Sequence, residues 1–146
     1  MQTYSGGGGS ASEQQLVLMH PDGKGTSDVV LTVPADSSLS IRACFSEADE
    51  KKRAGICHDE YNMAATLSLS GGGAMPDVHL EVESTHYPRG VSRDRDSLAM
   101  PPLKKRDQVW ETDKACTYKR DFHFDAGQNR YVTDKPLPDA CSFDQG

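Results

Sequence analysis

The sequence lacks the short motifs that usually mark catalytic and nucleotide-binding sites. It has no G-x-S-x-G or H-E-x-x-H segment, no P-loop and no dinucleotide-binding glycine fingerprint. It also has no C-x-x-C pair, because its four cysteines are separated by 13, 59 and 25 residues, which argues against a zinc knuckle and a thioredoxin-like dithiol. The sequence therefore assigns no catalytic residue, no metal site and no cofactor.

Long apolar runs and a positive net charge are also missing. No stretch approaches the roughly 18 apolar residues of a membrane-spanning helix, and the opening MQTYSGGGGSASEQQ lacks the basic and apolar regions of a signal peptide. The net charge of −6 argues against general nucleic-acid binding, because phosphates would have to approach an acidic surface. We expect no membrane span and no general nucleic-acid binding; if the protein is exported, its leader is absent from this chain.

The cysteines that are present favour two disulfides in an oxidising compartment. Of the three possible pairings, Cys44 with Cys57 and Cys116 with Cys141 is the simplest, because each bridge closes a local segment. An even cysteine count in a small chain that is only 36% hydrophobic fits a secreted protein or an external particle. The alternative is four reduced, buried cysteines in a cytosolic protein.

Apolar residues alternate in several short segments, as they do in half-buried β-strands. The organising stretch is 39–69, where Leu39, Ile41, Ala43 and Phe45 share one face, and the alternation resumes from Tyr61 to Leu69. The charged insert between them predicts a short helix that Ser46 caps and Gly55 ends. Further strands are predicted at 28–33, where Pro34 stops the segment, at 77–83 and around 117–132. These patterns predict an all-β antiparallel sandwich or jelly roll with one or two short helices and long loops.

Two segments have no such alternation. Residues 1–14 contain SGGGGSAS and predict a flexible N-terminal arm or linker, followed by a single β-rich domain at 15–146. Within that domain, 84–108 predicts a long loop, and long loops are often functional or mobile. The alternative for this loop is an exposed linker whose bases are neutralised by its own aspartates. The partner-binding candidates, in the loop and in the aromatic C-terminal part, are Arg89, Arg93, Arg95, Lys104, Lys105, Arg106, Trp110, Tyr118 and Tyr131.

Histidines on strands provide the remaining chemical candidates. His79 and Glu81 share a predicted outward face, but no third metal ligand is fixed by the sequence. Asp121 and Asp125 share a face with His123, which makes His123 a candidate general base, although no nucleophile is identified beside it.

Taken together, these features favour a noncatalytic structural or binding module of an extracellular surface, appendage or viral particle. Its expected partners are other protein subunits, a second copy included, and strand edges offer one way to bind them. One alternative is a small secreted hydrolase or toxin that uses His123. Another is a carbohydrate-binding module that stacks sugars on Trp110, Tyr118 or Tyr131.

Overall fold

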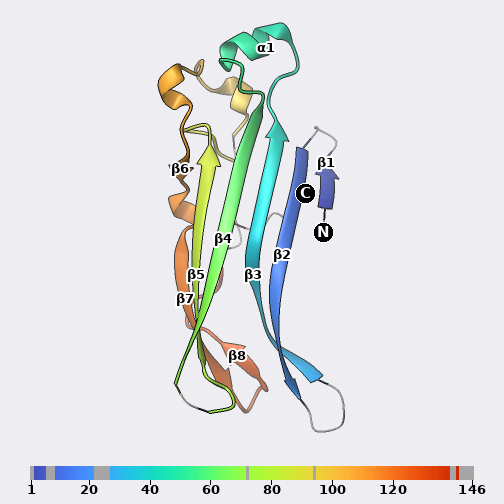
Figure 1. Cartoon of the computed structure of the whole chain (residues 1–146), viewed down its shortest axis with the longest axis vertical. Helices are drawn as coiled ribbons and strands as arrows, with labels where there is room; N and C mark the ends of the chain where they lie inside the picture. The colour runs from blue at the N-terminus through green and yellow to red at the C-terminus, as the bar shows by residue number, and fades with distance from the viewer. Residues whose placement is uncertain are drawn as a thin grey trace.

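The computed structural model describes residues 2–5, 9–21, 27–71, 73–93, 95–138 and 141, with side chains from residue 28 onward. Most of these residues lie in antiparallel strands, so the all-β prediction is confirmed (Figure 1). The elements in chain order are β1 (Gln2–Ser5), β2 (Gly9–Pro21), β3 (Ser27–Arg42), α1 (Glu47–Lys52), β4 (His58–Ser70), β5 (Asp77–Tyr87), η1 (Ser97–Ala99), η2 (Lys105–Asp107), β6 (Glu111–Thr112), η3 (Lys114–Cys116), β7 (Tyr118–Asp125) and β8 (Arg130–Val132).

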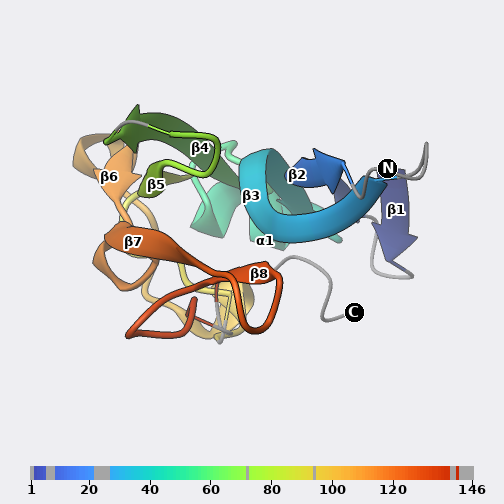
Figure 2. The same cartoon turned by 90° about the horizontal axis from the view of Figure 1, so that it is seen from below.

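The described strands form a single sheet in the order β1-β2-β3-β4-β5-β7-β8, and the short β6 pairs with β5 beside this path. The sheet is curled, as the end-on view in Figure 2 shows, and β8 comes back toward β3. There the side chain of Asn129 donates a hydrogen bond of 3.2 Å to Asp28. The predicted sandwich or jelly roll is not confirmed, because the described strands make one curled, open sheet that resembles half a barrel.

The hydrophobic core lies inside the curl. On β5, alternate residues point inward, so Val78, Leu80 and Val82 are buried while the residues between them are less so, as their two-residue period predicts. Strand β4 follows the same rule at Tyr61 and Met63. The core is completed by residues from the strands that curl around β5: Val30, Leu31, Val33, Met63, Phe122 and Tyr131.

The pairing partners of β3 change along its length. The sequence predicts that Pro34 ends a strand, but β3 runs through it with a register irregularity against β2 between Glu13 and Gln15. A sheet tolerates proline at such a bulge. Pairing of β3 with β4 ends at Asp36, whose carboxylate accepts a hydrogen bond of 3.3 Å from the backbone N–H of Ala65. The part of β3 that precedes Asp36 pairs with β2 and not with β4.

The link between β3 and β4 matches its predicted form. Helix α1 is capped by Ser46, whose hydroxyl accepts a hydrogen bond from the N–H of Asp49 at 3.2 Å, and Gly55 follows with a φ of 83°. One prediction here is wrong: Phe45 is 57% exposed, and the guanidinium of Arg42 lies 5.1 Å from the centre of its ring. The chain turns away from the sheet toward α1 at this residue, so the alternation of β3 no longer applies.

Both predicted disulfides are present, Cys44–Cys57 below α1 and Cys116–Cys141 near the C-terminus. Two disulfides are consistent with an extracytoplasmic location. Among the helices formed by the described residues, none is long and apolar enough to cross a membrane.

The two segments without alternation also have defined positions. Within 1–14, the described residues contribute β1 and the first part of β2 to one side of the sheet, while residues 1 and 6–8 lie outside the described part of the chain. Within 84–108, the first four residues complete β5, and η1 and η2 follow. The long connection between β5 and β7 therefore begins at Pro88.

Candidate partner-binding surface

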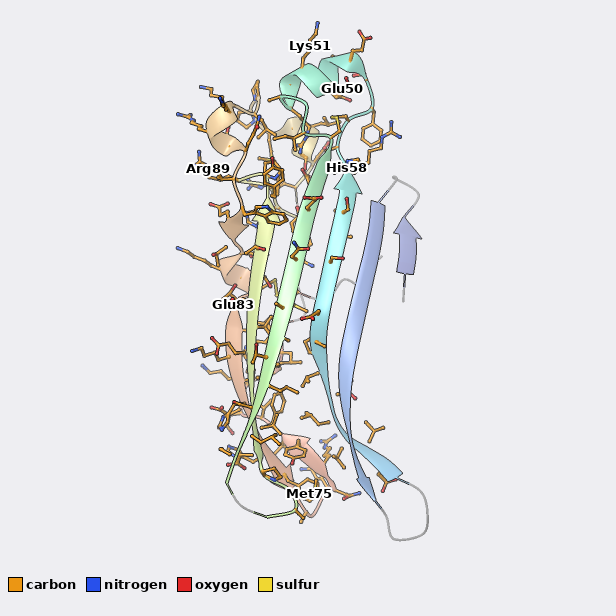
Figure 3. All side chains as sticks on the ribbon, viewed as in Figure 1. Glu50, Lys51, His58, Met75, Glu83 and Arg89 are labelled. Carbon is orange, nitrogen blue, oxygen red and sulfur yellow. A yellow bond between two sulfur atoms is a disulfide. The ribbon has the colours of Figure 1, made fainter. Side chains whose placement is uncertain are left out.

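The connection from Pro88 to Thr117 lies beside α1 at one end of the molecule (Figure 1). It is tied to the rest of the fold by backbone hydrogen bonds: the N–H of Leu103 donates to the carbonyl of Lys52 at 2.8 Å, and that of Asp113 donates to the carbonyl of Ser84 on β5 at 2.8 Å. Figure 3 shows Arg89 and Lys51 near this end, with Met75 at the opposite end. The described part of the loop is thus docked on the fold.

A buried ion pair anchors the loop to α1 and β4. Arg53 and Asp59 are each only 2% exposed, and their side chains are in direct contact. Further hydrogen bonds support the pair, because Arg53 Nε donates to the carbonyl of Ile56 at 2.8 Å and Ser97 donates to the second oxygen of Asp59. Removing either charge would leave the other buried without a charged partner.

Asp107 stabilises the part of the loop around η2 through its carboxylate. Its carboxylate accepts a hydrogen bond of 2.8 Å from the N–H of Lys104 and one of 3.0 Å from the guanidinium of Arg89. The backbone hydrogen bond, followed by that from Arg89, lowers the pKa of Asp107 below its ordinary value. This carboxylate therefore holds η2 in place without neutralising the neighbouring side chains of Lys105 and Arg106 by an ion pair.

Glu111 holds β6 against β5. One of its carboxylate oxygens lies 2.7 Å from Nε2 of His86 and 3.1 Å from the N–H of Gly90. These two hydrogen bonds, with His86 the larger cause, lower the pKa of Glu111. The adjacent Trp110 rests against Tyr87, with 5.4 Å between the ring centres.

An exposed patch results, which we call the arm patch: Lys104, Lys105, Arg106, Val109 and Trp110. Val109 and Trp110 are 44% and 47% exposed, although both are large apolar residues. The three cations are exposed too, and none forms an ion pair with a carboxylate among the described residues. Cations beside an exposed tryptophan on a docked loop are typical of a surface that binds another molecule.

The other three arginine candidates make contacts within the protein. Arg89 binds Asp107, and Arg95 donates to the carbonyl of Gly90 at 3.1 Å. Arg93 lies with its guanidinium 5.9 Å from the ring centre of Tyr61 and 3.2 Å from the sulfur of Cys116. These contacts stabilise the loop, and Arg89 and Arg95 remain exposed.

The two tyrosine candidates are largely inside the protein. Tyr131 is 6% exposed in the core, and its hydroxyl donates to the carbonyl of Pro76 at 2.7 Å. Tyr118 packs against the same core and has the guanidinium of Arg120 over its ring. Burial raises the pKa of both hydroxyls. Of the three predicted sugar-stacking rings, Trp110 is the one that is well exposed.

The histidines of the outer face pair differently from the sequence hypothesis. His123 contacts Asp77 at 3.1 Å instead of Asp121, while Asp125 accepts hydrogen bonds within its own turn. Asp121 instead contacts His79. Glu81, considered with His79 as a metal pair, lies 3.6 Å from Lys119.

Sequence reasoning missed these pairings because they depend on strand register. His79 lies opposite Asp121 and Val78 lies opposite Phe122, and the next residues of the two strands in that direction are Asp77 and His123. Ser70, which contacts His79, was also missed, because a strand-terminal serine carries no signal by itself. Within the described residues, no group of three or more histidine, cysteine, aspartate or glutamate side chains is placed to hold a metal ion.

The arm patch is thus a surface suited to binding. The outer face of the sheet carries two histidines that each contact a carboxylate, His79 with Asp121 and His123 with Asp77. Comparison with known proteins identifies no relative: no family model, no curated protein sequence and no solved structure matches the chain.

Proposed function

We propose that the protein is a structural or binding module of an extracellular surface, appendage or viral particle, which acts through protein–protein contacts made by the arm patch. The observation that carries this proposal is the exposure of Trp110, close in sequence to three exposed cations that have no ion-pair partner among the described residues. Tryptophan and arginine are enriched among the residues that dominate protein interfaces.

The contacts behind the patch support a binding role. Asp107 and Glu111 hold the two ends of the segment that contains the patch, so little loop entropy is lost when a partner binds. The partner surface that fits has carboxylates around an apolar hollow for Trp110. A second copy of this acidic chain is one such partner, and another subunit of the same assembly is the other.

The proposal is tested by cross-linking the native assembly through lysines and measuring the affinity of the partner found. We expect cross-links from Lys104 or Lys105 to another subunit, and Trp110→Ala is expected to weaken binding by roughly thirtyfold, the effect of losing about 2 kcal/mol at an interface hot spot. Charge reversal at Lys105 should slow association and weaken its dependence on salt, because one attractive charge is lost.

Two substitutions on other surfaces serve as matched controls. Lys135→Glu reverses an exposed charge outside the patch, and Val29→Ala shortens a side chain that is 55% exposed on β3. Both are expected to leave binding unchanged. Equal effects of patch and control variants, or a protein that stays monomeric without cross-links from the patch, would contradict the proposal.

The exposed Trp110 also favours a second candidate, carbohydrate binding by ring stacking. The two functions differ in their dependence on charge. Binding of a neutral oligosaccharide would be lost with Trp110→Ala and retained with Lys105→Glu, whereas the protein interface requires both residues.

A further inference from the structure

A second arrangement of functional groups lies on the outer face of the sheet, outside the arm patch. The hydroxyl oxygen of Ser70, at the end of β4, lies 2.6 Å from Nε2 of His79 on β5. The other ring nitrogen, Nδ1, contacts the carboxylate of Asp121 on β7. Three strands therefore place a hydroxyl, an imidazole and a carboxylate in a connected row.

The order of these contacts is that of an activated nucleophile. A carboxylate at Nδ1 favours the imidazole tautomer with its proton on that nitrogen, so Nε2 has its lone pair free to accept the proton of the serine hydroxyl. This is the arrangement in which a histidine acts as general base for a serine and a carboxylate holds the histidine in position.

Strand register builds the arrangement. His79 lies directly opposite Asp121 on β7 and opposite Ser68 on β4. Ser70 follows Ser68 on the same face of β4, so the ring of His79 reaches it along the diagonal between two strands. Because all three residues belong to hydrogen-bonded strands, their spacing is set by the sheet.

The row is open to solvent and to a substrate. The side chains of His79 and Asp121 are 41% and 68% exposed. Directly after Ser70, Gly71 has a φ of 84°, and a Cβ added there would meet nothing within 4 Å. The carbonyl group of a small molecule can therefore approach the hydroxyl of Ser70 from this side.

We propose that Ser70 and His79, positioned by Asp121, hydrolyse small, unhindered carboxylic esters with good leaving groups. Ser70 Oγ bonds to the carbonyl carbon while its proton passes to His79 Nε2. The C–O bond of the ester then breaks, and the departing alkoxide takes that proton and leaves as the alcohol. Water attacks the acyl group on Ser70, its proton passes through His79 back to Ser70 Oγ, and the carboxylic acid is released.

The exposed position sets the substrate class. A site on an open face supplies little binding energy and no enclosed environment to strengthen its hydrogen bonds, so amides, with their poorer leaving groups, are excluded. His123 is an internal control on the same face. It pairs with Asp77 as His79 pairs with Asp121, but it has no hydroxyl contact among the described residues.

The test measures hydrolysis of p-nitrophenyl acetate by the full chain and labelling by a fluorophosphonate, located by peptide mapping. We expect an initial burst, labelling of Ser70 and a rate about tenfold or more above that of free histidine at the same concentration. Ser70→Ala should abolish the burst and the labelling. The matched variants Ser68→Ala and His123→Gln should retain both.

Asp121 is tested by two substitutions. In Asp121→Asn the rate should fall through kcat, because the amide no longer fixes the His79 tautomer that leaves Nε2 free, whereas Asp121→Glu keeps a carboxylate and should restore part of the rate. The proposal would be overturned if Ser70→Ala hydrolysed the ester as fast as wild type does. It would also be overturned if the wild-type protein were neither labelled at Ser70 nor faster than free histidine.

Discussion

His86 donates a hydrogen bond to Glu111 across the β5–β6 pair, with 2.7 Å between Nε2 and the carboxylate oxygen. The same oxygen accepts the N–H of Gly90, so one carboxylate joins β5, β6 and the start of the long connection. This link positions Trp110, the residue before Glu111, at the surface.

The depressed pKa of Glu111 predicts how this link depends on pH. A carboxyl group whose folded pKa lies below its ordinary value of 4.5 stabilises the fold above that pH, and the contribution is lost as the pH falls through the lower, folded value. We expect Glu111→Gln to be less stable than wild type near pH 7, and the difference to shrink below about pH 4.5.

Urea unfolding between pH 3 and 7 measures this effect, with Glu83→Gln on the exposed side of β5 as the control. A stability difference between wild type and Glu111→Gln that stays constant across this range would contradict the assignment.

The buried pair Arg53–Asp59 predicts that removing one charge lowers the stability more than removing both. Arg53→Met leaves an uncompensated carboxylate in a site that is 2% exposed, and should lower the free energy of unfolding by about 3–5 kcal/mol. Adding Asp59→Asn to that variant should recover part of the loss. The control is Arg130→Met at an exposed arginine of β8, with an expected change within about 0.5 kcal/mol.

The two disulfides should stabilise the protein by different amounts. By loop-closure entropy, the 13-residue separation of Cys44–Cys57 contributes about 3 kcal/mol and the 25-residue separation of Cys116–Cys141 about 3.5 kcal/mol. Replacing each pair by alanine and comparing urea unfolding checks both values. Removal of either pair without loss of stability would show that the unfolded chain is not constrained in this way.

His123 should titrate above its ordinary pKa of 6.5, because Asp77 accepts its hydrogen bond and stabilises the charged ring. A raised folded pKa stabilises the protein below pH 6.5 and the effect disappears as the pH rises through the folded value. Proton NMR of the ring should show the raised pKa, and Asp77→Asn should return it toward 6.5. An unchanged titration in that variant would show that the ion pair does not form in solution.

Local patterns in the sequence determined several parts of this protein. The alternation from Val78 to Val82 predicts a half-buried strand, because successive strand residues point to opposite faces. The cap at Ser46 and the bridge from Cys44 to Cys57 are also local, since neither joins residues more than 13 positions apart. The all-β class follows from such short-range signals.

Only the tertiary structure decided which strand faces meet. The described strands form one curled sheet instead of two packed sheets, and Tyr131 is buried inside the curl while Trp110 is exposed. Register likewise pairs Asp121 with His79, 42 positions away, instead of with His123. A two-residue period sets the face of a side chain but not its neighbour across the sheet, because that neighbour depends on turns and loops that the period does not describe.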